Sequence, residues 1–600
     1  MIFYDFEVFR HDWLVVLIDP SNKTEKVIVN DVKKLQRFYD RHKNDIWIGY
    51  NSRHYDQYIL KALLCGFDAR AMNDWLVNEG GAGWQFSSLL NKIFLINYDV
   101  APLNKSLKQL EGFQGHSIHE SSVDFKIKRK LTDAEIAETI DYCRNDVLET
   151  INVFTELIDD FNAQMGLVKM FDLPLSAMGK TKAQISAEIL ECVRTERNDE
   201  WDLFALDCIE LSNTKRWLTV KKKKKKGDEE SKDDKTIGKV FCTPKEWFLN
   251  PKYQDYRYYF EMEVAEVPHQ FGWGGIHGAK KKYHYECKDG YIMLHIDVES
   301  YYPRLMIWHN LLTRSAKRPE RFKMIFDTRM KLKHEDKKKE QAPLKIVING
   351  TFGICKDKNN AAYDPRNANL ICINGQLMLL DLIEHLEAIP SFELIQSNTD
   401  GLIIKIHERD FDLCDDICYE WESRCDMILA FEFLDRIAQK DVNNYVFHFE
   451  DTPENGGKRN KIERKGAYVK ELSGIDNDLP IINKAINDMI LKGIDPEETI
   501  NNCNELIQFQ KICKLTNKFD YVKHNNRIYT NKCYRIFASR RESDGTVYKY
   551  KENRPNKFGN TSIHSFIENG DVTSAKVPSK LDKQWYINLA KERLKQYGIN

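Results

Sequence analysis

Long hydrophobic runs, a leader-like N-terminus and paired cysteines are all missing from this 600-residue sequence. No apolar run approaches the roughly 18 residues that a membrane span requires, so we expect no transmembrane helix and no membrane partner. The N-terminal MIFYDFEVF lacks a basic stretch followed by an apolar segment and a cleavage site, which excludes a secretory signal. We therefore expect a cytoplasmic protein whose N-terminal residues belong to the fold.

The fourteen cysteines contain no C-x-x-C pair, which favours reduced thiols over a disulfide framework. Cys414, Cys418 and Cys425 lie close together, but no histidine follows at zinc-finger spacing. Because Cys414 and Cys418 fit one face of a helix, a buried helix face is favoured over a zinc site. An excess of one charge is also missing, since 90 Lys and Arg balance 91 Asp and Glu to a net charge of −1. Overall charge therefore does not indicate a nucleic-acid partner, although both signs are frequent enough for local patches.

What the sequence does contain is typical of a folded multidomain protein. Hydrophobic residues make up 42% and aromatic residues 12% of the chain, and this length predicts roughly three to five structural units. One segment, VKKKKKKGDEESKDDK at 220–235, has no apolar residue after its first and is expected to be a solvated loop. A phosphate-contacting arm and a localisation signal are the alternatives for this segment.

The first part of the chain has the pattern of an α/β domain. MIFYDFEVF, WLVVLID and IWIGY have the composition of strands. A long amphipathic helix is predicted over about 133–160, because Thr132 and Glu135 fit a capping box at its start and an apolar stripe follows. Mixed strands and helices come after the charged segment, and the C-terminal third is rich in Lys, Asn and Tyr.

Acidic residues recur at the ends of these predicted elements. In YDFEVF, strand alternation places Asp5 and Glu7 on one side, where their repulsion is relieved by a divalent cation. Asp56 follows an apolar strand at the start of a predicted helix. Asp146 shares a face of the long helix with Tyr142, four residues before it. Taken singly, Asp56 and Asp146 also fit ordinary surface acids.

A second group of polar residues lies in the middle of the chain. MLHIDVESYYPRLM is a strand that runs into Asp297, and IQSNTDGLIIK is a strand, turn and strand with Asp400 at the tip. A carboxylate beside a buried sheet is costly unless something pairs with it, although an ordinary tight hairpin is the alternative. In APLKIVINGTFG, Lys345, Asn349 and Phe352 form one stripe of a helix.

The N-terminal pattern D-x-E, N-x3-Y-D and Y-x3-D, in that order, resembles the three motifs of the DEDDy 3′–5′ exonucleases. These enzymes have a ribonuclease H-like fold and proofread for DNA polymerases. The resemblance implies that Asp5, Glu7, Asp56 and Asp146 hold two metal ions, and that Tyr142 orients the attacking water.

SLKQL at 106–110 is similar to the S-L-x2-h motif with which that family contacts single strands. The similarity places Ser106 and Leu107 near the DNA end. Asn51 and Tyr55, from the N-x3-Y-D motif, are expected beside them.

The ordered set D-x2-S-x-Y-P, K-x3-N-G-x-F-G and N-T-D-G resembles motifs A, B and C of family B DNA polymerases, especially the compact phage enzymes. The resemblance implies a two-metal site for Mg²⁺, with Mn²⁺ as the alternative, at Asp297, Val298 and Asp400. Primer-template DNA and deoxynucleoside triphosphates would then be the substrates. The nucleotide would be bound by Tyr302, which lies under the sugar, and by Lys345, Asn349, Arg329 and Lys333.

Three departures from the polymerase pattern carry information. Motif C usually reads D-T-D, whereas Asn398 replaces its first acid here, which supports the alternative of an exonuclease with a degenerate, DNA-binding polymerase half. The Y-x-G-G link appears as GWGG at 272–275. KGAY at 465–468 is similar to the K-x-Y primer-strand motif with one extra residue, so Lys465 and Tyr468 are the expected DNA contacts.

Short spacings separate the motifs. About 42 residues lie between Tyr302 and Lys345 and about 43 between Gly353 and Ser397, so the insertions of protein-primed members do not fit. We expect extension of a nucleic-acid primer without a terminal protein. A phage helicase, primase or single-strand-binding protein would supply the remaining replication functions, and the enzyme itself is expected to be a monomer.

The fold class implied is α/β and α+β multidomain, with a ribonuclease H-like exonuclease domain followed by a right-hand polymerase. The C-terminal residues suit a thumb that grips duplex DNA, and a helical module that docks another replication protein is the alternative. The expected divisions are an exonuclease domain at 1–165, a connecting region at 166–265 with the charged loop near 220–236, palm at 266–310, fingers at 311–356, palm at 357–470, and thumb at 471–600.

Overall fold

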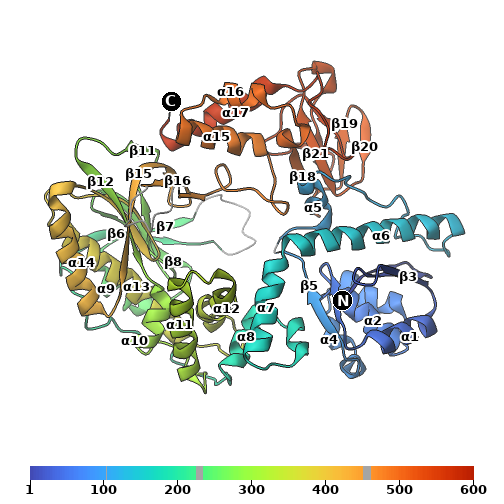
Figure 1. Cartoon of the computed structure of the whole chain (residues 1–600), viewed down its shortest axis with the longest axis horizontal. Helices are drawn as coiled ribbons and strands as arrows, with labels where there is room; N and C mark the ends of the chain where they lie inside the picture. The colour runs from blue at the N-terminus through green and yellow to red at the C-terminus, as the bar shows by residue number, and fades with distance from the viewer. Residues whose placement is uncertain (103, 225–233, 451–460, 600) are drawn as a thin grey trace. The chain divides into compact units, whose positions relative to one another are not determined.

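The computed structural model describes residues 1–102, 104–224, 234–450 and 461–599 (Figure 1). Most of the charged segment, residues 225–233, lies outside the described residues. The chain forms two compact units. Unit 1 comprises Met1–Thr181, Leu472–Ile482 and Glu497–Asn588, and unit 2 comprises Lys182–Glu471, Asn483–Pro496 and Leu589–Asn600. The expected mixed α/β organisation with several sheets is confirmed.

A five-stranded sheet forms the N-terminal layer of unit 1, in the order β3-β2-β1-β4-β5. Its strands are β1 (Ile2–Val8), β2 (Trp13–Asp19), β3 (Thr24–Val29), β4 (Ile46–Gly49) and β5 (Ile96–Asp99). The first three pair antiparallel, whereas β4 runs parallel to β1 and to β5. The three strands expected from the sequence are therefore present, and β3 and β5 are additional.

Helices cover this sheet and fill the sequence between its strands. They are α1 (Val32–His42), α2 (Asp56–Leu64), α3 (Ala69–Asn73), α4 (Gly83–Phe86), α5 (Leu107–Gln114), α6 (Asp133–Glu156) and α7 (Ile158–Met170). The capping box at the start of α6 is confirmed, because the Thr132 side chain accepts the backbone N–H of Glu135 while Glu135 caps Thr132 in return. The predicted helix over 133–160 is wrong at its end, since Leu157 leaves the helical conformation and α7 begins one residue later.

The C-terminal part of unit 1 packs onto α5. Its strands are β18 (Lys511–Lys514), β19 (Tyr521–His524), β20 (Arg527–Tyr529), β21 (Cys533–Ala538), β22 (Tyr548–Lys551), β23 (Arg554–Lys557) and β24 (Ser565–Ile567). They form a sheet β18-β21-β24 and a sheet β20-β19-β22-β23. Ile512 and Cys533 belong to the same hydrophobic core as Leu110 and Phe113 of α5, so both ends of the chain share one core.

Buried hydrogen bonds of Arg535 stabilise the packing of the C-terminal strands on α5. The Arg535 side chain is fully buried, and its guanidinium donates to the carbonyl oxygens of Gly112 at 3.2 Å and His116 at 2.7 Å. It also donates to Oε1 of Gln510 at 3.0 Å. Burial lowers the pKa of Arg535 to about 10. The group remains charged at neutral pH, and its hydrogen bonds compensate for the water that it has lost.

An antiparallel sheet of twelve strands forms the centre of unit 2, in the order β17-β16-β15-β12-β14-β13-β10-β9-β8-β6-β7, with β11 beside β15. The strands are β6 (Arg216–Lys222), β7 (Lys235–Cys242), β8 (Tyr258–Val264), β9 (Val267–Phe271), β10 (His277–Ala279), β11 (Tyr283–Glu286), β12 (Tyr291–Val298), β13 (Glu393–Asn398), β14 (Gly401–His407), β15 (Leu429–Asp441), β16 (Asn444–Phe449) and β17 (Ile462–Lys465).

Helices of unit 2 pack beside this sheet. They are α8 (Lys182–Ile189), α9 (Pro244–Phe248), α10 (Tyr301–Trp308), α11 (Pro319–His334), α12 (Lys338–Cys355), α13 (Pro365–Leu386) and α14 (Phe411–Cys425). Nearly every side chain of α13 is buried, and Trp421 of α14 donates to the carbonyl of Met378 in α13 at 3.0 Å. Cys414, Cys418 and Cys425 lie on the buried side of α14. The remaining helices are α15 (Pro480–Lys492), α16 (Pro496–Asn502) and α17 (Lys583–Leu594).

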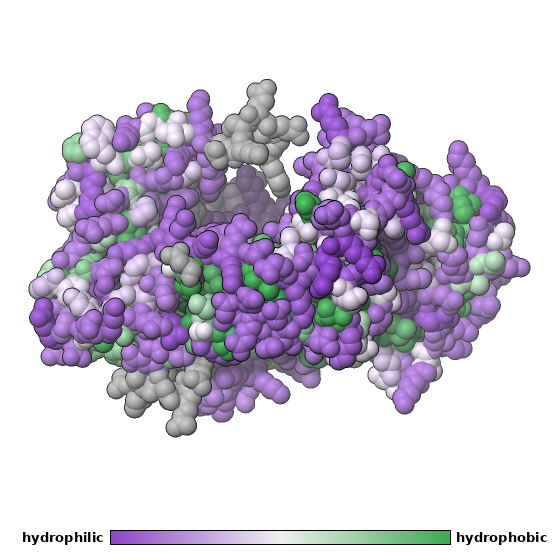
Figure 2. All heavy atoms as spheres, turned by 90° about the horizontal axis from the view of Figure 1, so that it is seen from above, coloured by the Kyte–Doolittle hydropathy of each residue, from purple (hydrophilic) through white to green (hydrophobic). Residues whose placement is uncertain are grey.

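The surface of the described residues is mainly hydrophilic, and Figure 2 shows its hydrophobic residues in small separate patches on the face that it presents. All fourteen cysteines are free thiols, as the spacing predicted. Within the described ranges, the membrane-span criteria of length and hydropathy are met by none of the helices.

The role of Arg535 can be measured. We expect Arg535→Met to lower the free energy of unfolding by about 2–4 kcal/mol, because several buried carbonyl groups lose their donors. Urea unfolding followed by circular dichroism measures this change, and Arg541→Met at an exposed position is the matched control. Equal unfolding midpoints for the two variants would contradict a stabilising role of Arg535.

Candidate functional site

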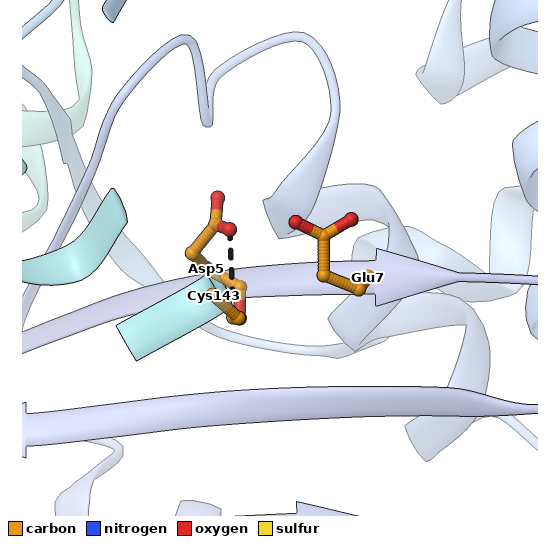
Figure 3. Close-up of side chains that lie close together, drawn as sticks. All are labelled: Asp5, Glu7 and Cys143. Carbon is orange, nitrogen blue, oxygen red and sulfur yellow. Dashed lines mark hydrogen bonds between the residues drawn. The ribbon is translucent and has the colours of Figure 1, made fainter. Parts of the chain in front are cut away.

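Unit 1 gathers acidic side chains where β1 faces α6. Asp5 and Glu7 point to the same side of β1 (Figure 3), as strand alternation predicted. One carboxylate oxygen of each and Sγ of Cys143 lie within 4.8 Å of one another. The Cys143 thiol donates to the backbone oxygen of Asp5 at 3.3 Å and to its Oδ2 at 3.5 Å. Asp56 is the first residue of α2, and its Oδ1 accepts the backbone N–H of Phe6 at 3.0 Å.

Burial and mutual repulsion make these acids hard to ionise. Burial, and then the charges of Asp56, Glu7 and Asp146, raise the pKa of Asp5 well above its ordinary value. The pKa of Glu7 is raised in the same way by burial, Asp146 and Asp56, and burial raises the pKa of Asp56 to about 7. Such a cluster of oxygen ligands fits a divalent cation, which would relieve the repulsion.

Lys108 is the functional residue that sequence reasoning missed in this cluster. Its ammonium group pairs with Asp146 and with Glu111, the latter at 2.8 Å, and lies 4.6 Å from the ring centroid of Tyr142. Burial and then the charge of Asp146 raise the pKa of Tyr142. The three-residue spacing of Lys108 and Glu111 within SLKQLE was the available signal, since it puts both on one face of α5.

A cleft of about 630 Å³ opens onto this cluster. Asp5 and Asp146 line it together with the predicted contacts Asn51, Ser106 and Leu107, and with Lys514 of β18. Tyr55 is different, because its hydroxyl donates to Oδ1 of Asn73 at 2.8 Å and it is not among the residues that line the cleft. The C-terminal part of the chain thus supplies a cation to the wall of an acidic cleft.

The loop that carries Asn51 is held by Asp99 at the end of β5. The carboxylate of Asp99 accepts the backbone N–H groups of Asn51 at 2.9 Å and Arg53 at 3.0 Å. Asn51 has a φ of 55°, a left-handed conformation that asparagine tolerates better than most residues. Asp99 therefore positions the loop that forms one wall of the cleft.

In unit 2, the sheet brings Asp297 and Asp400 together. Asp297 on β12 is paired with Gly401 on β14, and the backbone N–H of Val298 donates to the backbone oxygen of Asp400 at 2.8 Å. Burial and then the charge of Asp400 raise the pKa of Asp297 to about 6. Burial also raises the pKa of Asp400. The predicted hairpin with Asp400 at its tip is present, and the two acids have the oxygen chemistry that Mg²⁺ prefers.

The hairpin tip has an unusual backbone that a neighbouring segment supports. Thr399 has a φ of 55°, which is strained for a β-branched residue. Its N–H donates to the carbonyl of Ile276 at 2.9 Å. A Cβ on Gly275 would lie 2.6 Å from Oγ1 of Thr399. The GWGG segment therefore has glycine where the hairpin approaches it.

The predicted nucleotide-binding residues lie on three helices, α10, α11 and α12. Lys345 and Asn349 are exposed on α12, and the ring of Phe352 lies 4.7 Å from that of Tyr302. Tyr302 is half-buried, and its pKa is raised by loss of hydration, by Cys372 and also by Asp400. Phe352 of this stripe therefore contacts a ring that is close enough to Asp400 for its charge to raise the pKa of Tyr302.

The two α11 cations contact the loop after Asp297. Lys333 pairs with Glu299 at 3.1 Å. Arg329 donates to Oγ of Ser300 at 3.3 Å, while its Nε is buried without a partner among the described residues. An unused buried donor fits an anion.

The expected primer-strand residues lie at and after β17. Lys465 is close enough to Asp400 to lower its pKa. Tyr468 lies under two cations, 3.9 Å from Arg593 and 5.5 Å from Lys440, measured to its ring centroid.

His295, Glu432 and Lys461 were not singled out from the sequence. His295 contacts Glu432 at 3.2 Å across the β12–β15 pair, and Lys461 pairs with Glu432. His295 is two residues before Asp297, on the same face of β12, and this spacing was the only sequence signal.

Comparisons with known proteins find matches among solved structures only. No family model matches the chain, and no curated protein matches it. Among solved structures, a family B DNA polymerase from the hyperthermophilic archaeon Pyrobaculum calidifontis aligns with 99% of this chain and 77% of its own, at 14% identity and a TM-score of 0.39. A TM-score this low does not establish a common fold. The function is therefore inferred from the residues of the two acid clusters alone.

The acid clusters predict a pH dependence of stability. Because the pKa of Asp56 in the folded protein is about 7, the folded state binds more protons than the unfolded state between about pH 4 and 7. In EDTA the free energy of unfolding should therefore fall as pH rises through this range, and Mg²⁺ should remove much of the fall. Thermal melting at several pH values tests this.

Glu7→Gln should flatten the pH trend in EDTA because it removes one of the repelling charges, whereas Glu79→Gln at an exposed position of unit 1 should not. A trend that is identical with and without Mg²⁺, at matched ionic strength, would argue against cation binding by these acids.

Proposed function

We propose that the protein is a DNA-templated DNA polymerase with a 3′–5′ proofreading exonuclease. Unit 2 would hold the polymerase site at Asp297 and Asp400, and unit 1 the exonuclease site at Asp5, Glu7, Asp56 and Asp146. The observation that carries the proposal is that two separate sets of closely spaced, mutually repelling carboxylates lie at the positions of the two motif sets.

Mg²⁺, with Mn²⁺ as the alternative, would be held by these acids and by Val298, and would supply Lewis-acid stabilisation of phosphate oxygens. In unit 2, Lys345 would neutralise the triphosphate and protonate the pyrophosphate that leaves. Arg329 offers a buried donor that has no partner among the described residues, and Lys333 and Asn349 would complete the anion site.

In unit 1, the residues around the acids would hold the strand end and its water. Tyr142 lies one turn from Asp146 on α6 and would orient the attacking water. Asn51, Ser106 and Leu107 line the cleft and would contact the terminal nucleotides. Lys108, already paired with Asp146, would balance the negative charge that accumulates there.

Further parts of the proposal rest on the resemblance. Primer-template DNA would be the substrate, contacted by Lys465 and Tyr468, and priming would use nucleic acid rather than a terminal protein. A monomer that works with a helicase, a primase and a single-strand-binding protein in phage genome replication is the proposed setting. The ribonuclease H-like and right-hand domain divisions belong to the same proposal.

A second candidate is a 3′–5′ exonuclease whose polymerase half only binds DNA. Asn398, in place of the usual first acid of motif C, favours it. Primer extension distinguishes the two functions, because the second candidate predicts none.

The two sites should be separable by mutation. We expect Asp297→Asn with Asp400→Asn to reduce primer extension by about a thousandfold or more while trimming continues, because the metal-binding oxygens of unit 2 are lost. Asp5→Ala with Glu7→Ala should instead reduce trimming while primer extension continues. Extension and trimming of a labelled primer–template in Mg²⁺ measure both activities.

Asp415→Asn, at an exposed position of α14, is the control for this separation and should change neither activity. Failure of the Asp5→Ala, Glu7→Ala protein to extend a primer with all four deoxynucleotides would eliminate the polymerase and leave the second candidate.

Sugar selection is expected to depend on Tyr302. Its ring is fixed against Phe352, so a 2′-hydroxyl above it would clash. Tyr302→Ala should raise the ratio of ribonucleotide to deoxynucleotide incorporation by about tenfold or more. Single-nucleotide insertion kinetics measure this ratio, with Tyr419→Ala at an exposed position as the control. An unchanged ratio would refute the assignment of Tyr302.

A further inference from the structure

The sheet β20-β19-β22-β23 in unit 1 has one core-facing side and one outer side. On its core-facing side, Val522 is fully buried in a cluster with Val547 and Phe558. Strand register places Tyr521 opposite Tyr550 on the outer side. Because side chains alternate along each strand, the outer side also carries Lys523, Tyr548, Ile528 and Lys557.

Aromatic rings form a flat apolar surface on this outer side. The rings of Tyr521 and Tyr550 are stacked, with centroids 5.0 Å apart and planes at 10°. Neither ring is buried. The side chain of Ile528 is 58% exposed. Partly exposed aromatic rings beside an exposed aliphatic side chain suit a ligand with flat apolar faces.

The strands of this sheet are also strongly basic. Residues 521–529 and 548–557 contain six Lys and Arg and one acid, Glu552, whereas the whole chain has a net charge of −1. Lys557 is exposed and Lys523 partly exposed, and both are on the outer side. Positive charge interleaved with aromatic rings is complementary to a nucleic-acid strand, whose phosphates are negative and whose bases stack.

The strand β18, which belongs to the sheet β18-β21-β24 and precedes this sheet in the sequence, reaches the cleft of the same unit. Lys514, the last residue of β18, lines the cleft that contains Asp5 and Asp146. Tyr521 begins β19 seven residues later. The cation at the cleft and the cations of this sheet therefore come from one part of the chain.

We propose that the outer side of this sheet binds single-stranded nucleic acid, with bases stacked on Tyr521 and Tyr550 and phosphates on Lys523 and Lys557. In a duplex the base faces are stacked on each other and are not available to these rings, so the aromatic surface favours a single strand. The role of the sheet in presenting a 3′ end to the cleft rests on the proposed function of unit 1, whereas the binding itself does not.

Fluorescence anisotropy with the full chain in EDTA tests the binding. The probes are a labelled thymidine oligonucleotide and the same oligonucleotide in a duplex. We expect Tyr521→Ala with Tyr550→Ala to raise the Kd for the single strand about fivefold or more and to leave the Kd for the duplex unchanged. Tyr521→Phe with Tyr550→Phe keeps both rings and should bind as the wild type.

The lysines provide a second, independent variant. Lys523→Ala with Lys557→Ala should reduce the slope of log Kd against log salt concentration by about 1.4, since each lost phosphate contact removes about 0.7. Lys33→Ala with Lys43→Ala, at exposed positions beside α1, removes the same charge elsewhere in unit 1 and should leave binding unchanged. Thermal melting identifies any variant that does not fold.

The outcomes separate this inference from the proposed function. Wild-type affinity for the single strand in both the tyrosine and the lysine variants overturns the inference, and so does an equal loss for single strand and duplex. The wild type could bind the single strand through these residues but trim nothing in Mg²⁺. In that case the binding site on the sheet is confirmed and the exonuclease proposal fails. If trimming occurs, the tyrosine variant should raise KM and leave kcat unchanged.

Discussion

Repulsion between closely spaced carboxylates is the constraint around which both units are built. Asp5 and Glu7 repel each other from neighbouring positions of one strand, and Asp297 and Asp400 repel each other across a strand pair. Such groups are tolerable in a folded protein only when cations compensate them. A sheet is suited to this task, because its hydrogen bonds hold side chains at a spacing that the repulsion alone would enlarge.

Each cluster carries its own supporting cation among the described residues. Lys108 pairs with Asp146 in unit 1, and in unit 2 Lys461 and His295 pair with Glu432 beside Asp297. These cations lower the cost of ionising the acids without occupying every oxygen. The clusters therefore remain open to a further ligand, which is a property of a binding site rather than of a structural ion pair.

Local sequence patterns predicted the local geometry well. Alternation placed Asp5 and Glu7 on one side of β1, turn formers placed Asp400 at a hairpin tip, and a capping box marked the start of α6. Contacts between distant segments had no such pattern. Arg535 and Gly112 are 423 residues apart in the sequence, and a buried arginine cannot be told from a surface one by its neighbours. Lys108 was missed for the same reason, since its partner Asp146 is on another helix.

The shared core of unit 1 makes its acidic cleft depend on both ends of the chain. Ile512 and Cys533 pack with Leu110 and Phe113, and the buried guanidinium of Arg535 is satisfied by carbonyls next to α5. If the C-terminal strands were not docked, those carbonyls and the core side chains would face water. The same α5 carries Lys108 and Leu107, so the packing that satisfies Arg535 also positions the residues beside Asp146 and brings Lys514 to the cleft.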